Sequence, residues 1–293
     1  MSTLLSGENL AKEIRAVVKE EVEVLKNKFR ITPTLAAIFV GSCEESKLYI
    51  EFQKKVTQKL GIGYQVLNFS KKIDESELVD IIEELNNDEK IHGIILQLPL
   101  PRPLNSKRVI SAIKPEKDVE GVHPENLGRI LWEDERIVPC TAAAVMRLLA
   151  QTNQDLYGKE TVIVGHSEVV GKPLAMLLLN KMATVTVCHL ATTEKRKLED
   201  HVRRAEVLIV AVGKKDLIPG TWIREKATVI DVGINYDGGK VSGDVEFETA
   251  AEKAAYITPV PGGVGPVTVA LLMRNLVSAT KFQYKIKQEE TEN

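Results

Sequence analysis

The pattern of apolar and polar positions along the chain predicts a mixed α/β fold. Short apolar runs rich in β-branched residues predict buried strands at 34–41, 92–101, 161–165, 184–188, 206–213 and 227–233. Helical patterns separate the earlier runs, as in strand–helix–strand units that build a parallel sheet. We therefore expect an α/β protein with helices on the faces of a mostly parallel sheet.

Three stretches show helical periodicity clearly. The N-terminal stretch places Leu10, Ile14, Val17 and Val18 on one face, which predicts an amphipathic helix. A second helix runs to Leu60 and stops at Gly61, and a third is expected near residues 269–282. The apolar face of the second helix is predicted to consist of Leu48, Phe52, Val56 and Leu60.

Two segments predict domain boundaries. A turn, a helix and a polar loop fill residues 138–160, and residues 259–268 are dense in Gly and Pro. We expect one domain at 1–145, to which a C-terminal helix at 268–293 packs back, and a second domain at 146–267.

Composition narrows the class of protein further. A length of 293 residues suits about two domains, and a net charge of −2 offers no basic excess for nucleic acid or a membrane surface. Three widely spaced cysteines exclude a disulfide scaffold, and the five histidines lack metal-ligand spacing. The N-terminus lacks the apolar core of a signal peptide, so we expect a cytoplasmic protein without a membrane span.

Residues 160–180 read as strand, turn and helix with glycines at the turn. Gly165 ends the strand, and Gly171 lies six residues later at the start of the helix. Such a helix start offers backbone N–H groups to a pyrophosphate, and Ser167 can donate a further hydrogen bond. The middle glycine of the dinucleotide fingerprint is absent, so an ordinary strand–helix turn is the alternative. The parallel-sheet context favours the cofactor interpretation.

The end of the following strand bears on the choice of dinucleotide. An acid there usually binds the ribose 2′-hydroxyl of NAD, and an Arg accommodates the 2′-phosphate of NADP. This chain has His189 and Leu190 at that position, and His166 in the glycine turn. The lack of a fixed guanidinium favours NAD over NADP.

A second group of polar residues lies in the N-terminal half. Tyr49 and Gln53 are four residues apart on a helix, with Ser46 one turn earlier. Gln97 lies in an apolar, Pro-terminated run, and Asp118 in a charged loop. Each also has a structural interpretation: a half-exposed helix face, an amide satisfied by backbone, and a turn-stabilising carboxylate.

Together these stretches resemble the methylenetetrahydrofolate dehydrogenase/cyclohydrolase family. The segments that carry the resemblance are SKLYIEFQKK, HGIILQLPLP, KPEKDVEGVH, VGHSEVVGKP, DVGIN and ITPVPGGVGPVTVALL. The resemblance implies an N-terminal folate-binding α/β domain, a Rossmann-type NAD(P) domain, a cleft between them and a homodimer. It also implies a tetrahydrofolate derivative as the substrate.

The resemblance assigns roles to individual residues. It implies that Tyr49 stacks on the pterin and lines the catalytic cleft, that Gln97 matches the glutamine that hydrogen-bonds the family's catalytic lysine, and that Asp118 anchors the pterin. For the substrate it implies Ser46, Tyr49, Leu98, Pro99, Asp118, Pro261, Gly262, Gly263, Gly265 and Thr268. For the cofactor it implies Gly165, His166, Ser167, Val170, Gly171, His189, Leu190, Ala211, Val212, Gly213, Gly233 and Ile234.

One departure from the family pattern changes the expected chemistry. The family has Tyr-x-x-x-Lys, whereas this chain has Gln53 at the lysine position. Lys54 is adjacent, but one residue along a helix is a rotation of about 100°. A glutamine cannot titrate, so we expect hydride transfer to be retained and cyclohydrolase activity to be lost or very weak.

Two other interpretations remain open. The protein is bifunctional if Lys54 or another base acts in the cyclohydrolase step. Alternatively, it is a catalytically degenerate module that binds folate or nucleotide for regulation.

Two smaller departures from the family pattern are Glu120, where the family has a second Asp, and the absence of Pro after Thr141.

Overall fold

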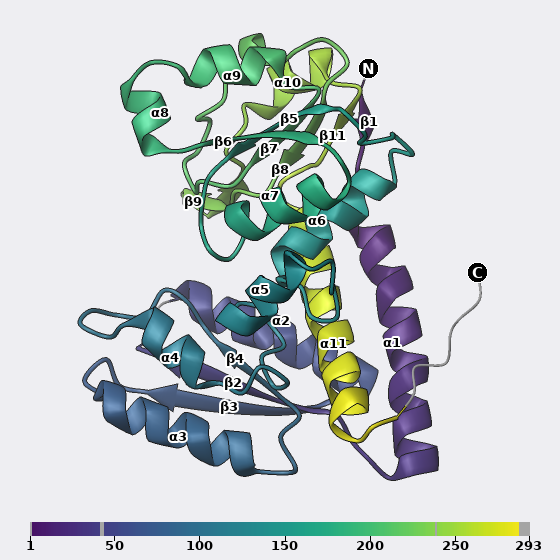
Figure 1. Ribbon diagram of the computed structural model, residues 1–293, viewed down its shortest axis with the longest axis vertical. Coiled ribbons are helices and arrows are strands. Elements are labelled where there is room, and N and C mark those ends of the chain that lie inside the picture. The colour runs from purple at the N-terminus through teal and green to yellow at the C-terminus, as the bar shows by residue number, and fades with distance from the viewer. Residues whose placement is uncertain (1, 42–43, 238, 287–293) are drawn as a thin grey trace. The chain divides into compact units, whose positions relative to one another are not determined.

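The computed structural model describes residues 2–41, 44–237 and 239–286, without the side chains of residues 44–49 and 237. The chain forms two compact units (Figure 1). Met1–Lys12 and Pro139–Leu271 form the six-stranded unit, and Glu13–Val138 and Leu272–Asn293 form the three-stranded unit. Two of the three divisions fall within long helices, α1 (Gly7–Phe29) and α11 (Val264–Gln283), and the third lies between Val138 and Pro139.

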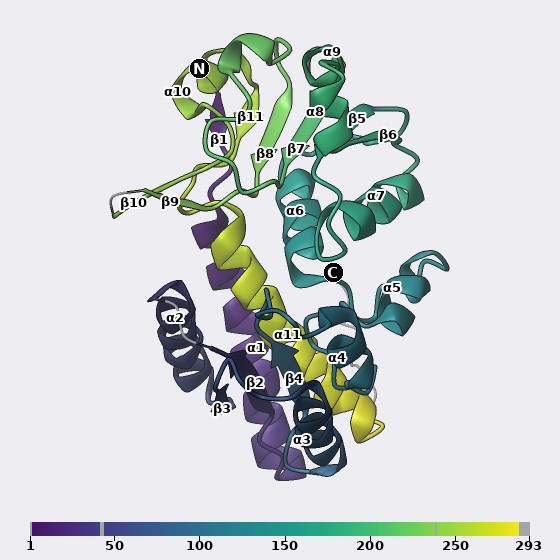
Figure 2. The same cartoon turned by 90° about the vertical axis from the view of Figure 1, so that its left-hand side faces the viewer.

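The six-stranded unit is built on one parallel sheet with the strand order β1-β11-β8-β7-β5-β6. Its strands are β5 (Glu160–Val164), β6 (Thr184–Cys188), β7 (Val207–Val210), β8 (Thr228–Asp231), β11 (Tyr256–Ile257) and β1 (Thr3–Leu4). An antiparallel hairpin of β9 (Asn235–Asp237) and β10 (Lys240–Ser242) extends from it (Figure 2). The helices are α6 (Cys140–Ala150), α7 (Gly171–Asn180), α8 (Leu190–Glu194), α9 (Leu198–Arg204), η1 (Gly220–Trp222) and α10 (Phe247–Lys253).

The core of this unit explains why its strands are so apolar. Alternate residues of β5, β7 and β8, such as Val162, Leu208 and Val229, pack against α9 and α10 through Val202 and Ala250. Both faces of a parallel sheet are covered by helices, so strands of this kind read as continuous apolar runs.

The three-stranded unit has a smaller parallel sheet with the order β3-β2-β4. Its elements are α2 (Glu44–Leu60), β2 (Thr34–Val40), β3 (Gly63–Phe69), α3 (Glu75–Asn87), β4 (Gly93–Leu96), α4 (Ser106–Ala112) and α5 (Pro124–Ile130). Ile38 and Ile94 pack against α3 and α4 through Ile82 and Val109. On the other face, Gly93 leaves room for the side chain of Leu276 of α11. A Cβ at position 93 would lie 2.7 Å from that side chain.

The expected α/β class is confirmed, and each of the six predicted apolar runs overlaps a strand. The apolar face predicted for the second helix is wrong at one position. Phe52 is 42 % exposed, whereas Gln53 is wholly buried beside Val56 and Leu60. The buried face of the described part of this helix consists of Gln53, Val56, Thr57 and Leu60, and the side chain of Leu48 lies outside the described residues. Among the described residues, no helix is long and apolar enough to cross a bilayer.

Candidate functional site

The predicted cofactor residues gather at one edge of the six-stranded sheet. Neighbouring strands β6, β5, β7 and β8 are all parallel, so the segments that follow them meet at the same edge. These segments contain Gly165 to Ser167 after β5, His189 and Leu190 after β6, Ala211 to Gly213 after β7, and Gly233 and Ile234 after β8. Open parallel sheets bind ligands at this edge, where the strand order reverses.

The reversal lies between β5 and β7, and the backbone is closely packed there. Gly165 has φ +121°, and a Cβ at this position would lie 2.2 Å from the carbonyl oxygen of Ala211. Only glycine allows this approach. The chain then turns through Ser167, whose Oγ accepts the N–H of Val170 at 3.2 Å, and α7 begins at Gly171. The glycine-lined turn and the helix start fit a pyrophosphate.

The segments that were predicted to lie near the dinucleotide's 2′ position contain two imidazoles. The His166 and His189 rings, at the ends of β5 and β6, have centroids 5.3 Å apart, and both residues are exposed. Leu190 follows and is 72 % exposed. Imidazoles can donate hydrogen bonds to a phosphate or a ribose, so this pair is compatible with both NAD and NADP.

Two buried carboxylates behind this edge were not recognised in the sequence. Asp231 ends β8, and Asp244 follows β10; both are almost completely buried. Burial, opposed by backbone N–H groups and reinforced by the Asp244 charge, raises the pKa of Asp231 to about 6. The signal in the sequence is an Asp within two residues of a glycine, Asp231 before Gly233 and Asp244 directly after Gly243, which indicates a carboxylate close to backbone.

The Gly- and Pro-rich segment near residue 262 also belongs to the six-stranded unit. The carbonyl oxygen of Gly262 accepts the N–H of Gly7 at 2.8 Å, so α1 and the start of α11 are tied together. Thr268 donates its hydroxyl to the carbonyl oxygen of Val264 at 3.1 Å. Of the predicted substrate residues, those from Pro261 to Thr268 are thus in this unit, whereas Leu98, Pro99 and Asp118 are in the other, together with the predicted catalytic residue Gln97.

Gln53 lies on the buried side of α2. Its side chain is wholly buried, and its Oε1 accepts the hydroxyl of Tyr64 at 2.7 Å. Its Nε2 is buried without a hydrogen-bond partner among the described residues. Lys54 is exposed, as expected for a residue rotated away from position 53. The side chains of Ser46 and Tyr49 lie outside the described residues.

Gln97 follows the carboxyl end of β4, where a side chain can reach a ligand. It is half-buried, its N–H donates to Ile38 at 2.9 Å, and its Nε2 donates to the adjacent Leu98 carbonyl at a weak 3.3 Å. The amide is therefore only loosely held by the protein. The Leu98–Pro99 peptide bond is cis, and Pro99 is exposed.

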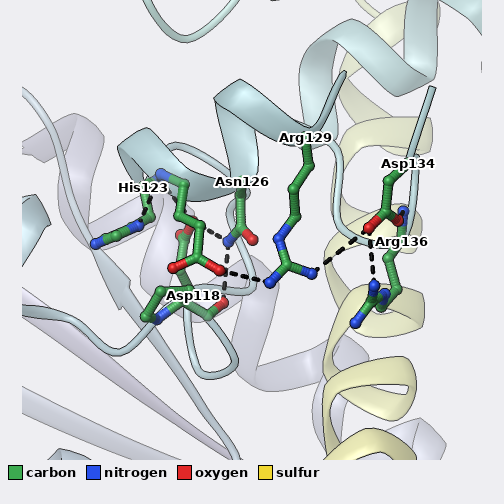
Figure 3. Close-up of polar contacts among 8 residues, drawn as sticks. Asp118, His123, Asn126, Arg129, Asp134 and Arg136 are labelled. Atoms are coloured by element: carbon green, nitrogen blue, oxygen red, sulfur yellow. Dashed lines mark hydrogen bonds and ion pairs between the residues drawn. The ribbon is translucent and has the colours of Figure 1, made fainter. Parts of the chain in front are cut away.

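Asp118 organises its own loop (Figure 3). Its Oδ1 accepts the N–H of Gly121 at 3.0 Å, and its Oδ2 accepts from the N–H of His123 at 2.7 Å and from Asn126 Nδ2 at 2.9 Å. The residue is 1 % exposed. Burial raises the pKa of Asp118, and the three hydrogen bonds oppose this increase. These contacts fit the turn-stabilising interpretation of the sequence.

Glu120 is the neighbouring carboxyl in the same loop, and it is less buried than Asp118. Burial and the Asp118 charge raise the pKa of Glu120 to about 8. A carboxyl with this pKa is largely protonated at neutral pH and can donate a hydrogen bond. Glu120 was noted in the sequence only as a departure from the family pattern.

Among the described side chains, no group of His, Cys, Asp and Glu is arranged to hold a metal ion.

Comparison with known families matches both halves of the chain. A model described as "Tetrahydrofolate dehydrogenase/cyclohydrolase, catalytic domain" matches residues 5–120. A second, described as "Tetrahydrofolate dehydrogenase/cyclohydrolase, NAD(P)-binding domain", matches residues 139–284.

Individual relatives match over nearly the full length. A protein of Bacillus licheniformis named "Bifunctional protein FolD" is 47 % identical over 281 residues, which are 96 % of this chain and 98 % of the relative. The bifunctional FolD structure from Campylobacter jejuni is 41 % identical, with a TM-score of 0.92 over 97 % of this chain and 100 % of that one. The Trypanosoma brucei FolD, complexed with NADP and an inhibitor, is 36 % identical, with a TM-score of 0.92 over 97 % and 99 %.

Proposed function

Because the chain belongs to the tetrahydrofolate dehydrogenase/cyclohydrolase family, we propose that it oxidises 5,10-methylenetetrahydrofolate to 5,10-methenyltetrahydrofolate with NAD(P). The observation that carries this proposal is the sheet edge at β5 and β7. There the backbone of Gly165 approaches Ala211 too closely for a side chain, and α7 begins six residues later.

The chain's own residues supply binding and orientation. The turn from Gly165 to Gly171 would hold the pyrophosphate, and the segments after β7 and β8 would hold the nicotinamide end. A bound NAD(P) supplies the hydride acceptor. Asp118 keeps its loop rigid, and Glu120 in that loop and Gln97 after β4 would offer polar groups to the folate. No protein base is required for hydride transfer, because the substrate's own nitrogen lone pair stabilises the methenyl cation.

The cyclohydrolase step has two candidate outcomes. The first is that hydrolysis is lost or very slow, which is supported by the buried, non-titrating Gln53 and by the exposure of Lys54. The second is a bifunctional enzyme that uses Lys54 or another base. The relatives in Bacillus licheniformis and Campylobacter jejuni, both named as bifunctional, favour this second outcome.

One experiment separates these outcomes. Purified protein is assayed for nicotinamide reduction with methylenetetrahydrofolate, and for hydrolysis of methenyltetrahydrofolate above the rate in buffer. Reduction without enzymatic hydrolysis supports the first outcome, and hydrolysis supports the second. No reduction with either dinucleotide contradicts the proposed function.

Variants at and beside position 53 identify the group responsible. If Lys54 is the base, Lys54→Ala abolishes hydrolysis, whereas the matched control Lys55→Ala, also exposed, does not. If hydrolysis is absent, Gln53→Lys should create it, since burial would lower the pKa of a lysine at this position. The same variant should leave the reduction assay active.

The preferred dinucleotide and the oligomeric state are two further proposals. We propose a preference for NAD, supported by the exposed Leu190 beside His166 and His189. The NADP complex of the Trypanosoma brucei relative favours the opposite preference. The ratio of kcat/KM for the two dinucleotides decides between them, and His166→Arg should shift the ratio toward NADP.

We also propose a homodimer, which light scattering after gel filtration would detect.

A further inference from the structure

The loop after β7 encloses a carboxylate that belongs to the protein itself. Successive backbone N–H groups point at the Asp244 side chain: Val212 donates to Oδ2 at 2.7 Å, Gly213 to Oδ2 at 2.9 Å, and Lys214 to Oδ1 at 2.7 Å. Gly213 has φ +68°, which gives the loop the concave form in which consecutive N–H groups bind an anion. Val212 and Lys214 themselves are exposed, but Asp244 is wholly buried.

The same carboxylate reaches the segment after β8. Asn235 Nδ2 donates to Asp244 Oδ1 at 2.9 Å and to the carbonyl oxygen of Gly243 at 3.1 Å. Asp244 thus contacts both segments, 212–214 and 235, that flank the nicotinamide end of the proposed dinucleotide site. Each of its oxygens accepts two hydrogen bonds.

Asp244 is in turn fixed from behind by Asp231. Asp231 Oδ1 accepts the N–H of Asp244 at 3.1 Å and that of Gly233 at 3.0 Å, and its Oδ2 accepts the N–H of Val245 at 2.8 Å. The two carboxylates therefore form a chain of contacts from the end of β8 through residue 244 to the loop after β7.

We infer that Asp244 is a positioning residue that preorganises the loops after β7 and β8 for the dinucleotide. This inference rests on the proposed use of NAD(P). A loop that is already ordered loses less conformational entropy when its ligand binds, so the role should appear in dinucleotide affinity. Asp244 itself is buried behind the loops and acts only through their backbone.

The direct test is Asp244→Asn. An asparagine has the same shape, but one oxygen becomes an NH2 group. Because both oxygens of Asp244 accept two hydrogen bonds each, either orientation of the amide would set that NH2 against two donors. We expect the Kd for NAD(P)H, measured by fluorescence without turnover, to rise about tenfold or more. The KM for methylenetetrahydrofolate should change by less than about twofold.

Glu246→Gln is the matched control. Glu246 lies two residues later, and its carboxylate also accepts a backbone N–H, from Gly220 at 3.2 Å, and the Thr249 hydroxyl at 2.6 Å. This variant removes the same charge from the same unit but should leave the Kd for NAD(P)H unchanged. A Kd for Asp244→Asn within about twofold of the unmodified protein would overturn the inference.

Amide hydrogen exchange on the unmodified protein tests the inference even if Asp244→Asn fails to fold. In the free protein, the N–H groups of Val212, Gly213 and Lys214 should exchange slowly although this loop is exposed, because each donates to Asp244. Rapid exchange in the free protein that slows only when NAD(P)H is added would overturn the inference. If the unmodified protein binds no NAD(P)H, the proposed function fails instead, and the exchange rates still report on the loop.

Discussion

His92 makes the stability of the three-stranded unit sensitive to acid. It directly precedes β4, is 3 % exposed, and its Nδ1 accepts the N–H of Thr34 at 3.1 Å. The proton of the neutral ring is therefore on Nε2, which is buried without a partner among the described residues. Burial and the positive charge of Lys117 lower the pKa of His92 to about 4, although Asp88 opposes this.

The sign and size of the effect follow from this pKa. In the unfolded chain the imidazole takes up a proton near its ordinary pKa of 6.5, while the folded protein does not until about pH 4. The free energy of unfolding should therefore fall as the pH falls from 6.5 toward 4. At about 1.4 kcal/mol per pH unit, His92 alone should lower the free energy of unfolding by about 2 kcal/mol by about pH 5.

The perturbation that isolates this residue is His92→Asn, in which Oδ1 replaces Nδ1 as the acceptor for Thr34. Urea unfolding of both proteins is followed by circular dichroism at about pH 7.5 and about pH 5. Asp118 and Glu120, whose pKa values are raised, have the opposite pH dependence, but they are present in both proteins and cancel in the difference. Between the two pH values, the unmodified protein should lose about 2 kcal/mol more than the variant. Equal losses, within about 0.5 kcal/mol, would refute the reasoning.

Three substitutions test other parts of the structure. Gly165→Ala should abolish NAD(P)H binding, because a Cβ would lie 2.2 Å from the Ala211 carbonyl oxygen. The control Gly158→Ala, which has φ +68° but open space around it, should retain binding, and equal affinities in the two variants would contradict the prediction. Asn126→Ala removes a donor from Asp118 and should lower the urea-unfolding free energy by about 1–3 kcal/mol; no change would show that this contact is dispensable. Phe39→Ala, at a position 2 % exposed, should cost about 3–5 kcal/mol in the same assay, and a loss below about 1 kcal/mol would contradict the tight packing of β2.

The sequence predicted the elements whose pattern is local and strong. The run at 184–188 corresponds to β6 residue for residue, and the glycine turn at Gly165 lies at the end of β5 as expected. β3 was missed because Gly63–Phe69 alternates only weakly and is half-buried rather than fully buried. β1 was missed because a two-residue strand has no periodicity, and its partner lies at the other end of the sequence.

The candidate site was predictable only in part, for a related reason. Gly165, Ser167 and Gly171 follow one another along the chain, so a motif identifies them. Asp244 is brought to Val212 by tertiary contacts over more than thirty residues, and no spacing rule links them. At Gln53 the sequence prediction was wrong. Phe52 was placed on the buried face because it is apolar, whereas the helix turns Gln53 toward the interior.

The pairing of β1 with β11 has a consequence for how the protein is made. Thr3 lies opposite Tyr256, so this part of the sheet joins segments about 250 residues apart in sequence. Ribosomes add about 5–20 residues per second, so β1 leaves the ribosome tens of seconds before its partner exists. The three-stranded unit likewise needs α11, because Leu276 of that helix packs against Gly93. Both units therefore need segments that are made late before their folds are complete: β11 for the six-stranded unit and α11 for the three-stranded unit.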